Sequence, residues 1–89
     1  VKMEEIDKIL YKLGYYDTDP LKKQEVQDYI DESVEFMKSA GVPEKQLTSS
    51  TAYVVKTIWA DARDAGKEDT LVKKDGMIVA LISQMRRSK

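Results

Sequence analysis

The sequence predicts an all-α protein, a small four-helix bundle with a polar loop between its last two helices. Apolar residues recur at the spacing of a helix face in four segments, and glycine, proline or a capping side chain marks the ends of those segments. The period-two alternation of a half-buried strand is absent apart from the short stretch "TLVKK". With 89 residues and no linker or repeat, the chain is expected to form a single domain over residues 1–89.

The first helix is expected over residues 2–13. Its apolar stripe has the spacing of one helix face and comprises Met3, Ile6, Ile9, Leu10 and Leu13. Gly14 follows, where a left-handed cap ends many helices. In the turn "YYDTDP", Thr18 or Asp19 can cap the next helix, and Pro20 presets the backbone of its first turn.

The second helix is expected over residues 20–40 and has two different faces. Its apolar face comprises Leu21, Val26, Tyr29, Ile30, Val34 and Met37, with Phe36 or Ser33 at the edge of the stripe. Its opposite face is acidic and comprises Glu25, Asp28, Asp31, Glu32 and Glu35. Gly41 and Pro43 end the helix, because glycine allows a left-handed cap and proline cannot continue the helical hydrogen bonds.

The third helix is expected to begin after a cap at Thr48, Ser49 or Ser50 and to end at Gly66. Its apolar side comprises Ala52, Val55, Ile58, Trp59 and Ala62. Residues 67–75 form the polar loop, which also contains Leu71 and Val72. The fourth helix is expected from residue 75 or 76 to residue 87, with an inward side of Ile78, Leu81, Ile82 and Met85. The residues expected to anchor the core are Ile30, Val34, Val55, Ile58, Trp59, Leu81 and Ile82.

The composition limits the chemistry that the chain can perform. It has no cysteine and no histidine, which excludes disulfides, thiolate metal sites and the commonest general base. Asp61 and Asp64 lie three residues apart on the third helix, where a carboxylate pair can bind Mg²⁺ or act as acid and base. Exposed acids at this spacing are common, and Arg63 and Lys67 can neutralise them. Because no glycine-rich phosphate loop is present either, we expect no enzyme, metal, cofactor or small-molecule substrate.

Charge is distributed unevenly, although the net charge is only −1. Residues 1–44 carry a formal charge of −5 and residues 45–89 a charge of +4, and the C-terminal end is the most basic part. This asymmetry favours contact between the basic end and an acidic partner, protein or nucleic acid. The alternative is a solvated helix end whose arginines offset the helix dipole. Small domains often need a disulfide, a metal or oligomerisation, and oligomerisation is the support that this composition leaves open.

Two further patterns bear on partners and location. "GYYD" places Tyr15 and Tyr16 together at a turn, where both rings cannot easily face the core. Tyrosine is favoured at interfaces, so an intermolecular surface is expected there, with loose packing on the bundle as the alternative.

The longest apolar run, "MIVALI", is too short to cross a bilayer, and no secretory pattern is visible. A cytoplasmic protein without a membrane partner is therefore expected.

The order of four segments is the most distinctive feature of the chain: "LGYYDTDP", "LKKQEVQDYIDESVEFMKSAGV", "VVKTIWADARDAG" and "MIVALISQMRRSK". This order resembles the head–tail connector (adaptor) family of tailed bacteriophages and prophages over nearly the whole chain. The resemblance implies a helical bundle that assembles as a ring beneath the portal, extends the DNA channel and joins the head to the stopper or tail. The implied partners are the portal protein, a stopper or tail-completion protein, further copies of the chain, and DNA that passes without being read. The implied location is the head–tail junction of the virion, and the host cytoplasm before assembly.

The resemblance also implies two sets of site residues. In the family, the C-terminal segment reaches the portal and the loop between the last two helices approaches the channel. The candidates for portal contact are therefore Met85, Arg86, Arg87, Ser88 and Lys89. The candidates for the channel-side loop are Lys67, Glu68, Asp69, Lys73 and Lys74. A small helical regulatory or DNA-associated protein is the alternative, although phosphates would repel the acidic second helix.

Overall fold

The computed structural model describes residues 4–16, 19–66 and 77–87, and these residues confirm the all-α class. The described ranges contain four α-helices, namely α1 (Glu5–Lys12), α2 (Pro20–Ser39), α3 (Ser50–Asp64) and α4 (Met77–Arg87). A short 3-10 helix, η1 (Glu44–Gln46), lies between α2 and α3 and was not predicted. The polar loop expected after α3 falls outside the described residues. No strand occurs within the described ranges.

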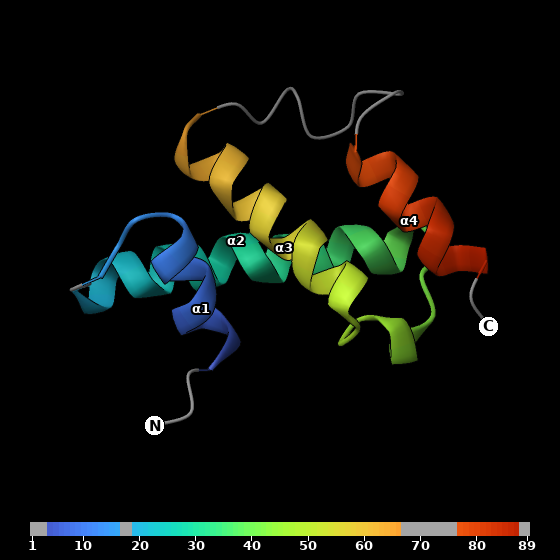
Figure 1. Cartoon of the computed structure of the whole chain (residues 1–89), viewed down its shortest axis with the longest axis horizontal. Coiled ribbons are helices and arrows are strands. Elements are labelled where there is room, and N and C mark those ends of the chain that lie inside the picture. Colours follow the sequence, from blue (N-terminus) through green and yellow to red (C-terminus); the bar gives the residue numbers. More distant parts are fainter. Residues whose placement is uncertain (1–3, 17–18, 67–76, 88–89) are drawn as a thin grey trace.

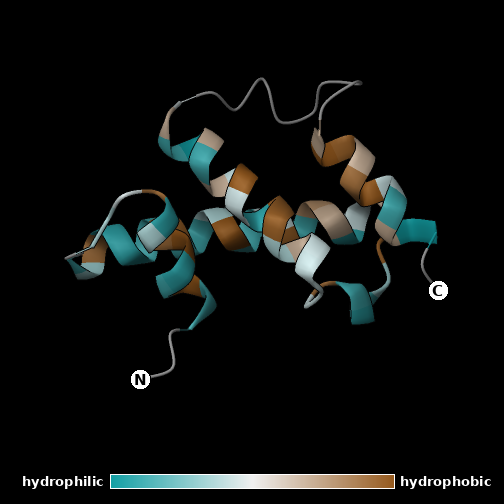
Figure 2. Ribbon diagram, in the orientation of Figure 1, coloured by the Kyte–Doolittle hydropathy of each residue, from teal (hydrophilic) through white to brown (hydrophobic). Residues whose placement is uncertain are grey.

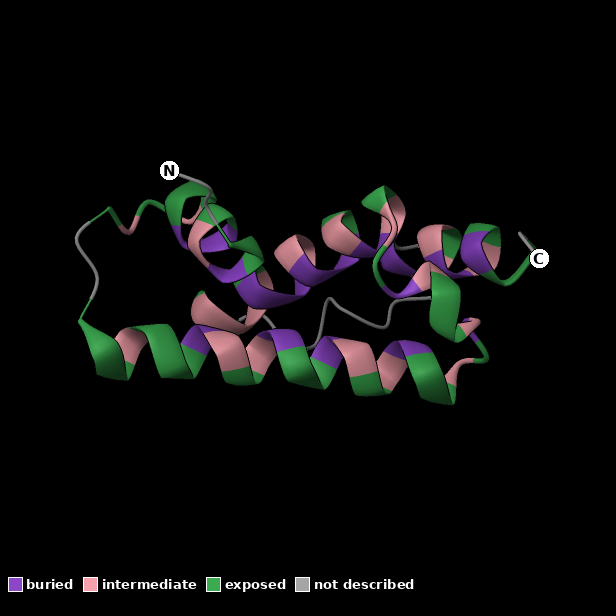
Figure 3. Cartoon of the chain, turned by 90° about the horizontal axis from the view of Figure 1, so that it is seen from below, coloured by how far each residue is buried: buried purple, intermediate pink, exposed green. Residues whose placement is uncertain are grey.

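The helices form two layers (Figures 1 and 3). The long helix α2 makes up one layer, and α1, α3 and α4 lie across its inner side. α3 contacts all three other helices, whereas α1 and α4 lie toward opposite ends of α2. The molecule measures 38 × 30 × 17 Å, and its smallest dimension fits two packed helix layers, whose axes lie about 8–10 Å apart. The outer side of α2 remains exposed (Figure 3).

The helix ends follow the capping signals in the sequence. The Asp19 side chain caps α2 by accepting a hydrogen bond of 2.8 Å from the backbone N–H of Lys22. The Ser49 hydroxyl caps α3 by accepting one of 3.1 Å from the backbone N–H of Ala52. After α2 the chain reverses at Gly41, whose φ of +90° is strained for any residue with a Cβ. Of the predicted N-cap residues, the structure therefore uses Asp19 for α2 and Ser49 for α3.

Two hydrophobic clusters share α2 and α3 and together make up the core. The larger one joins the C-terminal half of α2 to α3, α4 and the residues on either side of η1, and its buried members are Met37, Val42, Leu47, Ala52, Val55, Trp59, Ile78, Ile82 and Met85. The smaller one joins α1 to α2 and α3, and its buried members are Ile6, Ile9, Leu10, Val26, Ile30 and Ala60. Of the predicted anchors, Val34, Ile58 and Leu81 are partly buried against the larger cluster, and the other four are buried members.

The apolar face predicted for α2 needs one correction, because Leu21 is 85% exposed. The buried stripe of α2 runs through Val26, Ile30, Ser33 and Met37. Continued backward by four residues, this stripe reaches position 22 rather than position 21. Lys22 therefore points inward and Leu21 projects into solvent. Ser33, predicted only as an edge residue, is fully buried, and its hydroxyl donates a 2.6 Å hydrogen bond to the backbone carbonyl of Ile30.

A buried lysine ties α1 to α3. Lys56 is 5% exposed, and its Nζ lies 3.1 Å from Oε1 and 3.3 Å from Oε2 of Glu5. A buried ammonium without an anion is costly, so this ion pair fixes the position of α1 relative to α3.

We predict that Trp59→Ala lowers the free energy of unfolding by about 3–5 kcal/mol, the usual loss for removal of a core aromatic side chain. Trp59 is 9% exposed, and its ring centroid lies 5.0 Å from that of Phe36. Urea unfolding followed by far-ultraviolet circular dichroism measures the loss. Trp59→Phe is the control, because it keeps most of the apolar volume and should cost clearly less. Near-wild-type stability of the alanine variant would contradict a core role.

We also predict that Glu5→Gln destabilises the fold by about 1–3 kcal/mol, because it leaves the Lys56 ammonium buried without an anion. Lys56→Met removes the charge and keeps an apolar stem of similar length, so its cost should be below about 1 kcal/mol. Thermal unfolding of both variants at neutral pH tests the order. A methionine variant less stable than the glutamine variant would show that the ion pair itself stabilises the protein.

Candidate functional site

The acidic face predicted for α2 forms one wall of a groove. Asp28, Asp31, Glu32 and Glu35 follow one another at helical spacing, and all four residues are exposed. With Phe36 and with Trp59 of α3, these carboxylates line a hollow of about 500 Å³. We call this hollow the acidic groove. It combines carboxylates with aromatic rings, the two groups that a guanidinium binds best.

One arginine of the chain already occupies the rim of the acidic groove. Nε of Arg63 lies 2.9 Å from Oε1 of Glu32, and Nη2 lies 3.1 Å from Oε2, which is a two-pronged arrangement. The same guanidinium lies 5.2 Å from the ring centroid of Tyr29. Glu32 also accepts a 3.1 Å hydrogen bond from Nε1 of Trp59. The rim therefore shows, within one chain, how this surface holds a guanidinium.

Two carboxylates of the acidic groove are hydrogen-bonded to neutral groups. Asp28 accepts from Nε2 of Gln24 at 2.9 Å, and Asp31 accepts from Nε2 of Gln27 at 3.0 Å. Glu35 lies 3.8 Å from the ammonium of Lys38, a long and exposed ion pair. The groove therefore keeps a surplus of negative charge in spite of Arg63.

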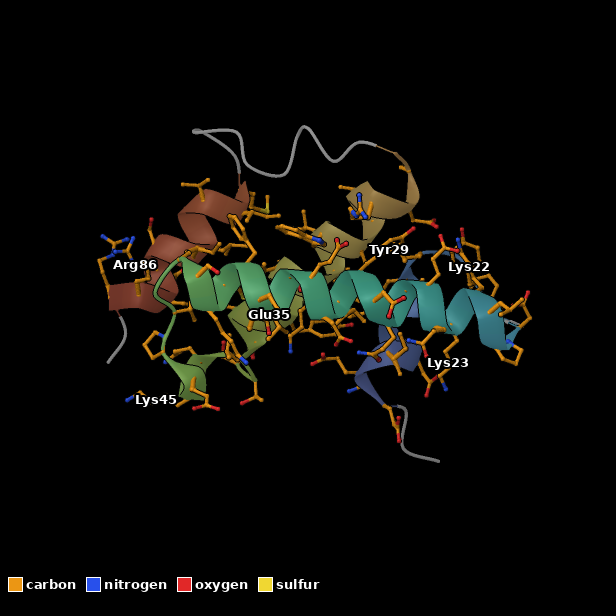
Figure 4. The ribbon with its side chains drawn as sticks, turned by 180° about the vertical axis from the view of Figure 1, so that it is seen from behind. Lys22, Lys23, Tyr29, Glu35, Lys45 and Arg86 are labelled. Atoms are coloured by element: carbon orange, nitrogen blue, oxygen red, sulfur yellow. The ribbon has the colours of Figure 1, made fainter. Side chains whose placement is uncertain are left out.

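The end of α4 carries the opposite charge. Arg86 and Arg87 are exposed in its last turn, and with Ser83 they line a second hollow. In Figure 2 α4 is hydrophobic in its first turns and hydrophilic at this end. Among the described residues, no carboxylate forms an ion pair with either arginine. Figure 4 shows Arg86 at one extremity of the molecule and Glu35 in the C-terminal half of α2.

A polar cluster joins the turn after α1 to the end of α3. Asp64 forms an ion pair with the ammonium of Lys22 and accepts a 2.7 Å hydrogen bond from the hydroxyl of Tyr15. Burial of Asp64 would raise the pKa of its carboxyl, but the Lys22 ammonium and the Tyr15 hydroxyl outweigh this and lower it. The hydrogen bond to Asp64 raises the pKa of Lys22 above its ordinary value. This cluster stabilises the fold and leaves both Asp64 oxygens engaged.

The structure separates the residues that the resemblance assigned to portal contact. Arg86 and Arg87 are exposed, whereas Met85 is 1% exposed and belongs to the larger core cluster. The Met85 side chain points inward because it continues the stripe of Ile78 and Ile82, so it offers no surface to a partner. Ser88 and Lys89 lie outside the described residues. So does the whole candidate channel-side loop, which comprises Lys67, Glu68, Asp69, Lys73 and Lys74.

Asp61 and Asp64, the carboxylate pair predicted on α3, lie in two different environments. Asp61 is exposed, whereas Asp64 is held by Lys22 and Tyr15. Across the described parts of the chain, no group of three or more carboxylates is placed to hold a metal ion.

The two tyrosines of the turn "GYYD" also lie in different environments. Tyr15 packs against the smaller core cluster, whereas Tyr16 is 73% exposed. The Tyr16 ring contacts the exposed Tyr11 ring edge-on, with 4.8 Å between the two ring centroids.

The sequence did not predict that Phe36 and Trp59 line the acidic groove, nor that a polar cluster forms around Asp64. The acidic face was visible as a helical pattern, but the neighbouring Trp59 was assigned only to the core. The one local signal for the cluster was Lys22, which stands four residues before Val26 in the buried stripe.

Comparison with known protein families, curated proteins and solved structures finds no match for this chain. None of the described helices has both the length and the apolar composition that a membrane crossing needs.

We predict that Asp64→Asn makes the free energy of unfolding fall less steeply as the pH is lowered. The pKa of this carboxyl is lower in the folded chain, so the unfolded chain binds the proton first as the pH falls. The stability it contributes is therefore present at neutral pH and is lost below about pH 4. Urea midpoints between about pH 7 and pH 2 should fall less steeply for Asp64→Asn than for the wild type. Asp61→Asn, on the exposed side of the same helix, is the control, and an equal change in both variants would contradict the prediction.

Proposed function

We propose that this chain is a structural adaptor of a tailed phage or prophage. It assembles as a ring beneath the portal, extends the DNA channel and joins the head to the stopper or tail. DNA passes through the ring without being read. The adaptor works at the head–tail junction of the virion and is present in the host cytoplasm before assembly.

The observation that carries this proposal is the separation of charge between the acidic groove and the end of α4. A surface with strong charges of both signs in different places suits repeated contacts with protein neighbours. The order of the helical segments, which resembles that of the connector family, supports the same function. In such an assembly the chemistry lies in the contacts, so we propose a non-enzymatic role without a cofactor.

A small regulatory or DNA-associated protein is the alternative function. The exposed side of α2 weighs against it, because its carboxylates would repel a phosphate backbone along the length of the acidic groove. The basic end of α4 contributes two described arginines, and two such phosphate contacts supply modest affinity without sequence preference.

We predict that the full chain caps portal rings and that removal of residues 86–89 abolishes capping without unfolding the domain. The core contacts of α4 come from Ile78, Ile82 and Met85, which all precede the cut. Electron microscopy of each chain, mixed with the portal protein encoded nearest to its gene, measures capping. Circular dichroism checks the fold, and Lys45→Ala, an exposed charge on η1, serves as the matched control.

Two outcomes would contradict the proposed function. The first is a full-length chain that never caps the portal ring. The second is a specific footprint on a short DNA duplex, which would favour the alternative.

A further inference from the structure

We propose that the acidic groove of one copy binds the Arg86–Arg87 end of α4 of a second copy, in a head-to-tail contact that repeats around the ring. This inference deepens the proposed function and rests on it. The resemblance assigns these arginines to the portal, whereas the surface chemistry of the chain points to another copy of itself.

The chemistry of the acidic groove matches that of its proposed occupant. The groove offers carboxylates on α2 and the rings of Phe36 and Trp59, whose centroids lie 5.0 Å apart. Arg63 and Glu32 show on its rim that this surface holds a guanidinium in a two-pronged ion pair. A further guanidinium can use Asp28 and Asp31, whose described partners are neutral glutamine amides.

Within one chain, the acidic groove and the Arg86–Arg87 end of α4 do not pair with each other. Arg86 and Arg87 form no ion pair with the described carboxylates, and Arg86 lies at the extremity of the molecule (Figure 4). Both surfaces are exposed and lie on different elements, so one copy can use both at once with two different neighbours. A contact between two different surfaces of identical copies is heterologous, and it forms a ring when the rotation closes.

The contact between two copies is expected to be weak by itself. Each exposed ion pair contributes little, so two free copies should associate weakly and the contact should weaken with salt. In a ring every copy makes the contact twice, and closure makes the last contact intramolecular. A weak pairwise contact is therefore compatible with a stable ring on a portal and with a largely dissociated chain in dilute solution.

The experiment is a charge exchange measured by sedimentation up to about 1 mM protein, without portal. The tail variant is Arg86→Glu with Arg87→Glu, and the groove variant is Asp28→Lys with Asp31→Lys. Alone, each variant opposes like charges at the contact, and we expect its self-association to be at least about tenfold weaker than that of the wild type. Mixed in equal amounts, the two variants restore opposite charges at every contact between unlike copies, and we expect association to return.

The control exchanges two charges outside both surfaces. Glu44→Lys with Lys45→Glu alters exposed residues of η1 and should leave self-association unchanged. Circular dichroism confirms that each variant is folded. Raising the salt from about 50 to 500 mM should weaken association of the wild type and of the mixture alike.

Three results would overturn the inference. One is a wild type and a mixture that both stay monomeric throughout the concentration range. Another is self-association that neither variant weakens. The third is a mixture that does not recover, because the charges would then act through something other than mutual contact. Portal capping by the wild type, measured separately, would in each case leave the proposed function standing, with the arginines free to contact the portal.

Discussion

The crossing of α3 over α2 is the contact on which the rest of the structure depends. Both core clusters contain residues from these two helices, and α1 and α4 pack against the resulting pair. Neighbouring residues of α3 serve different clusters, since Trp59 fills the larger one and Ala60 lies in the smaller one. A large ring next to a small methyl group lets α3 bury bulk on one side and approach closely on the other. Loss of this crossing would leave α1 and α4 without a common support.

Because the protein is thin, ion pairs and hydrogen bonds outside the core add to the stability that the core contributes. A molecule 17 Å thick has little interior, and a short chain buries a small share of its surface. The ion pair of Lys56 with Glu5 connects α3 to α1. The contacts of Asp64 with Tyr15 and Lys22 connect α3 to the segment between α1 and α2 and to the first turn of α2. Partly buried charges tolerate only a few partners, so these links specify where the N-terminal elements dock.

The same two-layer arrangement explains why α2 presents a surface suited to contacts. Only one side of this helix is used for packing, and a helix of 20 residues leaves a long outer side in solvent. That side carries carboxylates, and the crossing places Phe36 and Trp59 beside them. Core packing and the acidic groove thus share Phe36 and Trp59, and the Trp59 ring is packed inside while its Nε1 reaches Glu32 on the rim. The groove is therefore held by the same contact that holds the fold.

The helices, their caps, the exposed acidic face of α2 and the basic end of α4 could be predicted from residue order, because each depends on neighbours within a few positions. Asp19, Ser49 and Gly41 act within a single turn of backbone. The tertiary structure decided that Lys22 and not Leu21 faces the neighbouring elements in the first turn of α2, and which polar groups meet. Tyr15 and Asp64 are 49 residues apart, and Arg63 and Glu32 are 31 apart. Helical periodicity tells which side of a helix is apolar, but the partner of a side chain depends on how two helices cross, and that angle is set by the packing of many side chains at once.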